Sequence, residues 1–295
     1  MDPAPVSGPR GAAAILADIR LSHSIFALPF AAIGLLVGTG GEVPSWTLAA
    51  KILAAMVLAR SAAMGFNRLT DARFDATNPR TRGRALPSGR VSRRAMIGFV
   101  VVTSLGFVAV AGSLSTLCLA LSPVVLAVLF FYSLTKRFTP WAHLFVGLAL
   151  GLSPPAAYLA ARGSVEADVI SVLWLALAVL LWVGGFDIIY ACQDVEHDRR
   201  EGLSALPARL GPERALSVAR WLHVAMLVAV GLAGVSGGWS TLGWVAVALV
   251  AVLLVVEHAL VWGGDLSRVD AAFFTINGLV SVAFGGLVGA DLLVA

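Results

Sequence analysis

Charged residues are scarce in this sequence: Asp, Glu, Lys and Arg make up 13% of the 295 residues, whereas 59% are hydrophobic. A soluble domain carries about 25% charged residues, so the composition excludes an ordinary soluble protein. Several apolar runs reach the roughly 20 residues that a helix needs to cross a bilayer, and they lack the period-two alternation of membrane barrels. Because backbone groups in lipid must bond to one another, we expect an all-α integral membrane protein.

Cysteine and linker sequence are also nearly absent. Cys118 and Cys192 lie in or near apolar helical runs, so they indicate neither a disulfide framework nor a metal site. No polar linker divides the chain, so we predict a single transmembrane domain over residues 1–295, with a short disordered lead at 1–10. The first apolar run lacks a convincing cleavage site, so we expect a retained helix rather than a signal peptide.

Polar, Gly and Pro breaks divide the sequence into about nine predicted spans. They cover residues 20–40, 45–66, 93–112, 115–135, 141–161, 168–191, 216–236, 240–262 and 271–293. Of the 21 basic residues, 18 fall in the N-terminal segment and in the loops on one side of these spans. By the positive-inside rule, the N-terminus and these loops should be cytoplasmic.

An acidic cluster lies at the cytoplasmic end of the second span. Asn67, Asp71 and Asp75 are spaced by four, so on a helix they share one face. Like charges at that spacing repel, so a counter-ion is expected, and hard oxygen ligands of this kind suit Mg²⁺. The alternative is a solvated helix face, or carboxylates that pair with neighbouring arginines.

A second acidic cluster ends the sixth span. Asp194 and Asp198 are again spaced by four, and Tyr190 lies one turn earlier on the same predicted helix face. Four crossings separate the two clusters, so both should lie on the cytoplasmic side. Carboxylates there can hold Mg²⁺, the metal can hold a diphosphate, and basic side chains can bind the remaining phosphate oxygens. This pairing predicts a diphosphate-binding site more strongly than either cluster alone.

These two motifs resemble the signature motifs of the UbiA superfamily of intramembrane prenyltransferases. The resemblance extends to residues 23–31, 78–90, 135–139, 190–194 and 273–277. These segments look like the bacterial 4-hydroxybenzoate polyprenyltransferase-like branch, including relatives assigned to menaquinone synthesis by the futalosine route. One position departs from the pattern, because Arg68 stands where many members have an acidic residue.

The resemblance implies a nine-span bundle around a central cavity, with both motifs at its cytoplasmic mouth. It implies that Asn67, Asp71, Asp75, Asp194 and Asp198 hold Mg²⁺, and that the four aspartates are catalytic. The residues expected to bind or flank the diphosphate are Asn67, Arg80, Lys136, Arg137 and Tyr190.

We therefore expect an enzyme of the inner membrane that transfers a polyprenyl group from a prenyl diphosphate to an aromatic acceptor. The expected acceptor is 4-hydroxybenzoate or a related acid in ubiquinone or menaquinone synthesis, and no nucleic acid is an expected partner. Alternative acceptors are a naphthoate, a haem precursor or a chlorophyll precursor, and a different class is an ion or lipid transporter.

For four further polar residues, the sequence is consistent with two roles each. Arg20 and His23 either meet an acceptor carboxylate or anchor the first span at the interface. Arg60, on the Asn67 face of its helix, either points into the cavity mouth or pairs with an acidic residue. Asn277, inside the last span, needs a polar partner and either bonds a neighbouring helix or lies near the acceptor.

Overall fold

The computed structural model describes residues 11–19 and 26–294. All the regular secondary structure in this part of the chain is helical, as the composition predicts. The predicted lead at 1–10, and Arg20 and His23, lie outside the described residues.

Eight helical segments of the described chain are long and apolar enough to cross a membrane. They are formed by α3 (Trp46–Thr77), α4 (Arg93–Leu114), α5 (Thr116–Thr135), the pair α6 (Ala142–Gly151) and α7 (Ser153–Arg162), α8 (Val169–Ala191), α11 (Pro212–Ser236), α12 (Thr241–Leu260) and α13 (Asn277–Val294). A ninth apolar helix, α2 (Leu28–Gly38), is shorter. The prediction of about nine helices is therefore confirmed; α2 begins at Leu28, and residues 20–25 of the predicted first span lie outside the described residues.

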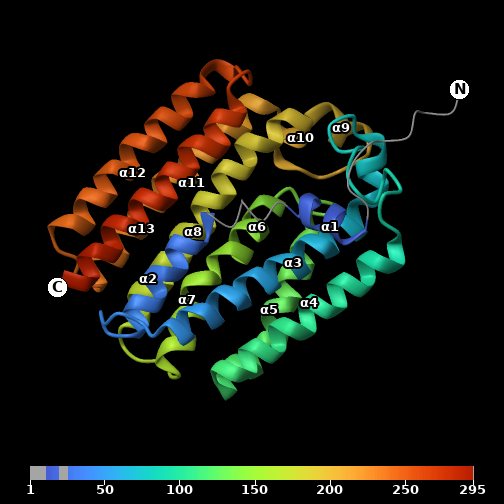
Figure 1. The fold of residues 1–295 in the computed structure, drawn as a ribbon. Helices are drawn as coiled ribbons and strands as arrows, with labels where there is room; N and C mark the ends of the chain where they lie inside the picture. The colour runs from blue at the N-terminus through green and yellow to red at the C-terminus, as the bar shows by residue number, and fades with distance from the viewer. Residues whose placement is uncertain (1–10, 20–25, 295) are drawn as a thin grey trace, which may run out of the picture.

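Shorter elements connect or extend these helices. They are α1 (Ala12–Asp18), η2 (Cys192–Asp194), α9 (Val195–Arg200), α10 (Leu206–Leu210), η3 (Trp262–Gly264) and the π-helix η4 (Ala271–Ile276). Figure 1 shows α9 and α10 at one end of the bundle, the end at which the loop after α3 also lies. This end carries both acidic motifs.

Local sequence explains where several helices begin. The side chains of Ser45, Ser92 and Ser115 each accept a hydrogen bond from a backbone N–H in the first turn of α3, α4 and α5, respectively. Helix α3 continues 11 residues beyond the predicted boundary at residue 66, because its polar last turns are held by cations from elsewhere: Lys136 bonds Asp71 and Arg84 bonds Asp75.

Helix α8 is the most buried of the long helices and lies in the middle of the bundle (Figure 1). Its Trp182 is fully buried in the main apolar core, which also includes Phe30 and Phe284. Gly147 of α6 permits close packing on α8, since a Cβ there would lie 2.2 Å from the carbonyl oxygen of Leu180. The backbones of α6 and α8 therefore approach more closely than larger side chains would allow.

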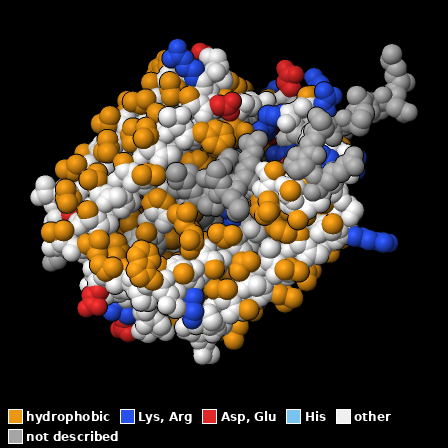
Figure 2. All heavy atoms as spheres, in the orientation of Figure 1, with side chains coloured by type: hydrophobic (Ala, Val, Ile, Leu, Met, Phe, Trp, Pro, Cys, Tyr) orange, Lys and Arg blue, Asp and Glu red, His pale blue; other side chains and the backbone are white. Residues whose placement is uncertain are grey.

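The surface matches a protein embedded in lipid. Figure 2 shows that the middle of one face is covered mainly by hydrophobic and neutral groups, with charged side chains toward its edges. Toward the end of the bundle opposite the acidic motifs, Asp168 accepts hydrogen bonds from the Tyr158 hydroxyl at 2.5 Å and from Arg162 at 2.6 Å. Partial burial alone raises the pKa of Asp168, but these two bonds outweigh it and lower the pKa below its ordinary value.

Candidate active site

The first acidic motif occupies the last turns of α3. Asn67, Asp71 and Asp75 lie on one continuous helix, as their spacing predicts, and both carboxylates are buried. Asn67 Nδ2 donates to Asp71 Oδ2 over 3.1 Å, and Lys136 Nζ lies 2.7 Å from the same oxygen. Arg84 Nη1 donates to Asp75 Oδ1 over 2.7 Å. Two cations from other segments thus compensate the charge of the motif.

The second motif does not lie on a continuous α-helix, so that part of the prediction is wrong. Helix α8 ends at Ala191, the 3-10 turn η2 follows, and α9 carries Asp198. The Arg80 guanidinium forms an ion pair with Asp194 and donates to the Tyr190 hydroxyl over 2.9 Å. Burial lowers the pKa of Arg80, but the hydrogen bond and charge of Asp194 outweigh it and raise the pKa, so Arg80 stays charged.

The loop after α3 brings the two motifs together. Asn78, which ends α3, donates to Asp194 Oδ1 over 3.2 Å, and Arg80 follows two residues later. Asp198 lies within electrostatic range of both Asp194 and Lys136, and Lys136 also bonds the first motif. The structure therefore gathers the predicted acidic residues, Arg80, Lys136 and Tyr190 into one polar site.

Arg137 is the outer member of the predicted set. Its guanidinium donates to the Thr70 carbonyl over 2.6 Å and lies 5.6 Å from the centroid of the Phe74 ring. Lys136 lies over the same ring at 5.8 Å. Phe74 thus holds both cations beside the first motif, although no described carboxylate pairs directly with Arg137.

The donor set of the site fits Mg²⁺. Asp71 Oδ1 and Asp75 Oδ2 are buried oxygens without a hydrogen-bond partner in the structure, and an unpaired buried carboxylate oxygen is costly unless a cation binds it. Within residues 11–19 and 26–294, no three His, Cys, Asp or Glu side chains form a ready-made metal cage. Mg²⁺ commonly uses one or two carboxylates completed by water and substrate phosphate, which this arrangement permits.

Arg68, which stands at the position that departs from the family pattern, is buried and links α3 to α1. It donates to the Asp18 carbonyl over 3.2 Å, and its Nη1 donates to Asn67 Oδ1 over 3.1 Å. An amide oxygen has two lone pairs, so Asn67 keeps one for a metal. Arg68 therefore orients Asn67 without removing it from the candidate ligand set.

An apolar cavity of about 500 Å³ lies within the bundle, and its wall includes Arg60 of α3 and Asp187 of α8, each seven residues before a motif residue on the same chain segment. The part of the wall nearest the motifs contains Arg60, Tyr132 and Asp187. The far part contains Leu114, the last residue of α4, and Cys118, in the first turn of α5. Of the two interpretations of Arg60, the structure supports the one in which this residue faces the cavity. An apolar chain would match the apolar part of this wall, and a charged or polar group would match the part that contains Arg60, Tyr132 and Asp187.

Sequence reasoning missed four residues of this region. Asp187 lies in the cavity wall, and its Oδ2 is 2.7 Å from Nδ1 of the buried His143. The sequence does contain a pattern that indicates Asp187, because this residue precedes Asp194 by seven residues, or about two helical turns. His143, Asn78 and Arg84 carried no such signal, since their roles depend on contacts between distant segments.

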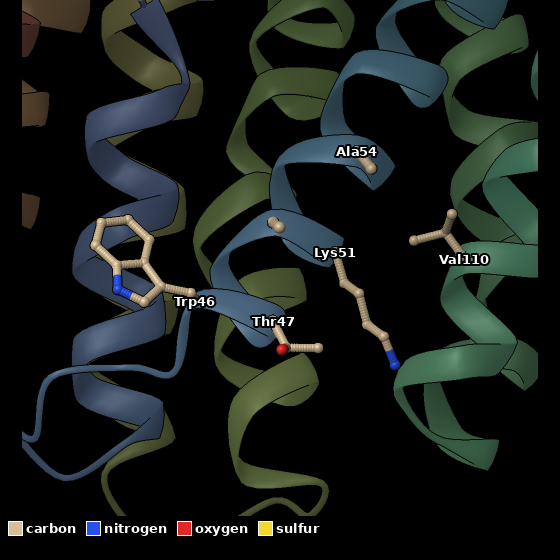
Figure 3. A pocket seen from close by; sticks show the side chains of 6 residues that line it. Trp46, Thr47, Lys51, Ala54 and Val110 are labelled. Atoms are coloured by element: carbon tan, nitrogen blue, oxygen red, sulfur yellow. The ribbon is translucent and has the colours of Figure 1, made fainter.

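A second hollow lies at the other end of α3, far along that helix from the acidic motifs (Figure 3). Trp46, Thr47, Ala50, Lys51, Ala54 and Val110 line it. Lys51 extends toward the end of α4, where its Nζ donates to the Ser113 carbonyl over 2.9 Å. This hollow therefore contains a hydrogen bond that links α3 to α4, and no residue of the candidate site lines it.

Comparison with known proteins agrees with this geometry. The UbiA prenyltransferase family model matches residues 27–279. The 4-hydroxybenzoate octaprenyltransferase of Citrobacter koseri is 32% identical over 256 residues, which cover 85% of each chain. That of Aeromonas salmonicida is 30% identical over 255 residues, covering 85% of this chain and 86% of the relative.

Two solved structures share the fold. The apo structure of a UbiA homologue from Aeropyrum pernix K1 has a TM-score of 0.84 and 35% identity, covering 93% of this chain and 99% of that one. A UbiA homologue from Archaeoglobus fulgidus bound to GPP and Mg²⁺ has a TM-score of 0.71 and 18% identity, covering 96% of this chain and 100% of that one. The second likeness, at its low identity, concerns the fold alone.

Fold, site and relatives together define a multi-pass membrane enzyme of the prenyltransferase class. The chain belongs to the UbiA prenyltransferase family. The predicted all-α fold, family and enzyme class are thereby confirmed, and the alternative of an ion or lipid transporter is not supported.

Proposed function

We propose that this protein transfers a polyprenyl group from a prenyl diphosphate to 4-hydroxybenzoate or a related aromatic acid, in a Mg²⁺-dependent reaction. The observation that carries the proposal is that the loop after α3 brings the two acidic motifs together through Asn78 and Arg80, while an apolar cavity is walled by the preceding turns of the same two helices. The names of the relatives from Citrobacter koseri and Aeromonas salmonicida support the same donor and acceptor chemistry.

The diphosphate half of the site contains both signs of charge. We assign Asn67, Asp71, Asp75, Asp194 and Asp198 to Mg²⁺ and Arg80, Arg84, Lys136 and Arg137 to phosphate oxygens, with Tyr190 beside them. When bound, Mg²⁺ supplies charge neutralisation for the departing diphosphate. The cations assist by stabilising the same negative charge as the carbon–oxygen bond breaks.

The acceptor half lies deeper, in the part of the cavity wall formed by Arg60, Tyr132 and Asp187. We assign Arg60 to the carboxylate of the aromatic acid, because a cation in an apolar wall suits an anionic substrate. The allylic carbon released from diphosphate bonds to the aromatic ring, and the ring must then lose one proton. Asp187, oriented by His143, is the proposed acceptor of that proton.

The apolar remainder of the cavity suits the prenyl tail. Its walls exclude water, which would otherwise capture the allylic cation. The predicted orientation places the motifs and their basic loops on the cytoplasmic side, where soluble acceptor and diphosphate are available. We retain this orientation, and the single domain over 1–295, as part of the proposal.

A direct test uses purified protein in liposomes with Mg²⁺, a labelled prenyl diphosphate and a panel of acceptors that includes 4-hydroxybenzoate and a naphthoate. We expect a prenylated 4-hydroxybenzoate that disappears on chelation of the metal and in Asp71→Ala and Asp194→Ala. Arg60→Leu should raise the KM of the aromatic acid more than that of the diphosphate. A folded wild type that forms no product and releases no diphosphate contradicts the proposal.

A further inference from the structure

A second buried polar cluster lies on the other side of α8, apart from the acidic motifs. It consists of Trp182 on α8, His223 on α11, Glu257 on α12 and Asn277 at the start of α13. Each of the four has an exposed fraction of 2% or less. Polar groups buried among membrane helices are costly and usually have a function, and the diphosphate chemistry uses none of these four.

The four residues form a ring of contacts, which closes through the backbone carbonyl of Trp182 rather than through its side chain. Trp182 Nε1 donates to Asn277 Oδ1 over 2.6 Å, and Asn277 Nδ2 donates to Glu257 Oε1 over 2.6 Å. Glu257 Oε2 lies 3.5 Å from His223 Nδ1 without a hydrogen bond, because His223 Nδ1 is hydrogen-bonded to His258 Nε2 over 3.0 Å. His223 Nε2 lies 3.1 Å from the Trp182 carbonyl. The ring therefore ties four helices to one another.

Gly185 makes room for this ring. A Cβ at that position would lie 2.3 Å from His223 Nε2, so only glycine lets the imidazole reach the backbone of α8. An ordinary apolar contact between α8 and α11 would not require this opening. The local structure is thus arranged around the polar contact.

Asn277 also holds the π-helix η4, because its Nδ2 donates to the Ala272 carbonyl over 3.0 Å. The side chain of Asn277 thus supplies a hydrogen-bond donor to the π-helix, whose backbone hydrogen bonds depart from the α-helical pattern. Such π-turns inside helices often occur at functional sites. Within this turn, Phe273 faces the cavity. Its ring centroid lies 4.3 Å from that of Tyr190 and 5.2 Å from that of Phe186.

The contacts continue to the diphosphate site, since the Tyr190 hydroxyl accepts from Arg80, which pairs with Asp194. We infer that Asn277 and Glu257 are positioning residues: they hold η4 so that Phe273 supports the Tyr190 ring beside Arg80 in the diphosphate site. This inference builds on the proposed function, because it assigns a purpose to the placement of Tyr190.

The sequence offers a probe that does not depend on activity. The chain contains three tyrosines, Tyr132, Tyr158 and Tyr190, so 3-fluorotyrosine labelling should give three fluorine resonances, with Tyr190 assigned by Tyr190→Phe. We expect Asn277→Leu to shift the Tyr190 resonance and to leave that of Tyr158 in place. Asp291→Asn, a buried polar change at the opposite end of α13, is the matched control and should leave Tyr190 unshifted.

Kinetics provide the second readout. Asn277→Leu should raise the KM for prenyl diphosphate by roughly tenfold, the change that about 1.4 kcal/mol of binding energy produces. A role in stability alone would lower the active fraction, and hence kcat, with KM unchanged. Glu257→Gln, which keeps the acceptor for Asn277, should retain the wild-type KM and Tyr190 resonance, whereas Glu257→Met should behave like Asn277→Leu and replaces it if that variant does not fold.

The outcomes separate this inference from the proposed function. A Tyr190 resonance that stays in place in Asn277→Leu and Glu257→Met, or that shifts equally in Asp291→Asn, overturns the positioning role whatever the activity. A wild type without prenyl transfer, combined with the expected resonance shifts, leaves the positioning of Tyr190 supported and refutes the reaction instead.

Discussion

Replacing Asp71 with asparagine should separate the chemistry of the site from its folding. Asp71 is 3% exposed, its Oδ2 bonds Asn67 and Lys136, and its Oδ1 has no hydrogen-bond partner. The amide keeps the shape of the side chain, removes its charge and replaces one acceptor oxygen by an NH2 donor. The partner Lys136 is partly exposed, with a side-chain exposure of 31%, so water can solvate its charge in the variant.

The substitution should affect the stability of the protein and its activity to different extents. We expect the free energy of unfolding to change by about 1 kcal/mol or less, because partly exposed ion pairs contribute little and a buried charge carries a desolvation cost that the amide lacks. Activity should fall by about 10²–10³-fold, because the lost charge acts on the leaving diphosphate, where one preorganised group is worth about 2.7–4 kcal/mol.

The assay measures prenylated product at saturating Mg²⁺, with thermal unfolding in the same detergent. Asp291→Asn, which removes a buried carboxylate charge beside Ser240, serves as the control and should keep wild-type turnover. If Asp71→Asn retains activity near that of the wild type, or loses activity only in proportion to its folded fraction, then Asp71 does not have the proposed metal role.

Three further predictions concern other parts of the molecule. Gly147→Ala should lower stability by about 1–3 kcal/mol, because its Cβ meets backbone of α8 rather than a movable side chain; an unchanged melting temperature would refute the close contact. Lys51→Met should leave turnover unchanged, since the hollow of Figure 3 lacks the groups of the site; lost turnover would implicate it. The pKa of Asp168 is lowered on folding, so its stabilisation exists above the ordinary pKa of about 3.9 and is lost as pH falls below it. The melting temperatures of wild type and Asp168→Asn should therefore differ near pH 7 and converge in acid, whereas a constant difference would contradict the assignment.

Helix number and the acidic motifs could be predicted because both depend on local spacing. Long apolar runs can satisfy their backbone groups in lipid only as helices. Asn67, Asp71 and Asp75 lie on one helical face whatever surrounds them. The same argument failed for Asp194 and Asp198, since the 3-10 turn η2 interrupts the helix between Tyr190 and Asp198. Periodicity does not indicate where a helix changes its winding.

The cations and the cavity wall depend on tertiary contacts and left weaker signals. Arg84 is one of many arginines in a basic loop, and its pairing with Asp75 follows from the path of that loop after α3. His143 is a single polar residue in an apolar helix, and its importance emerges only when α6 packs on α8 and brings it to Asp187. Spacing along one helix cannot encode either contact.

The two buried polar clusters show why one was visible in the sequence and the other was not. The metal site needs several like charges close together, and repeating carboxylates at helical spacing on two helices achieves this. The ring around Asn277 needs one group from each of four helices. Each helix therefore contributes a single polar residue, which on its own predicts no more than a contact with a neighbouring helix. The expected helix–helix bonding of Asn277 is confirmed, yet its partners Trp182 and Glu257 lie 95 and 20 residues away. A lone polar residue inside a membrane span is therefore best judged by the number of other spans that carry one at the same depth.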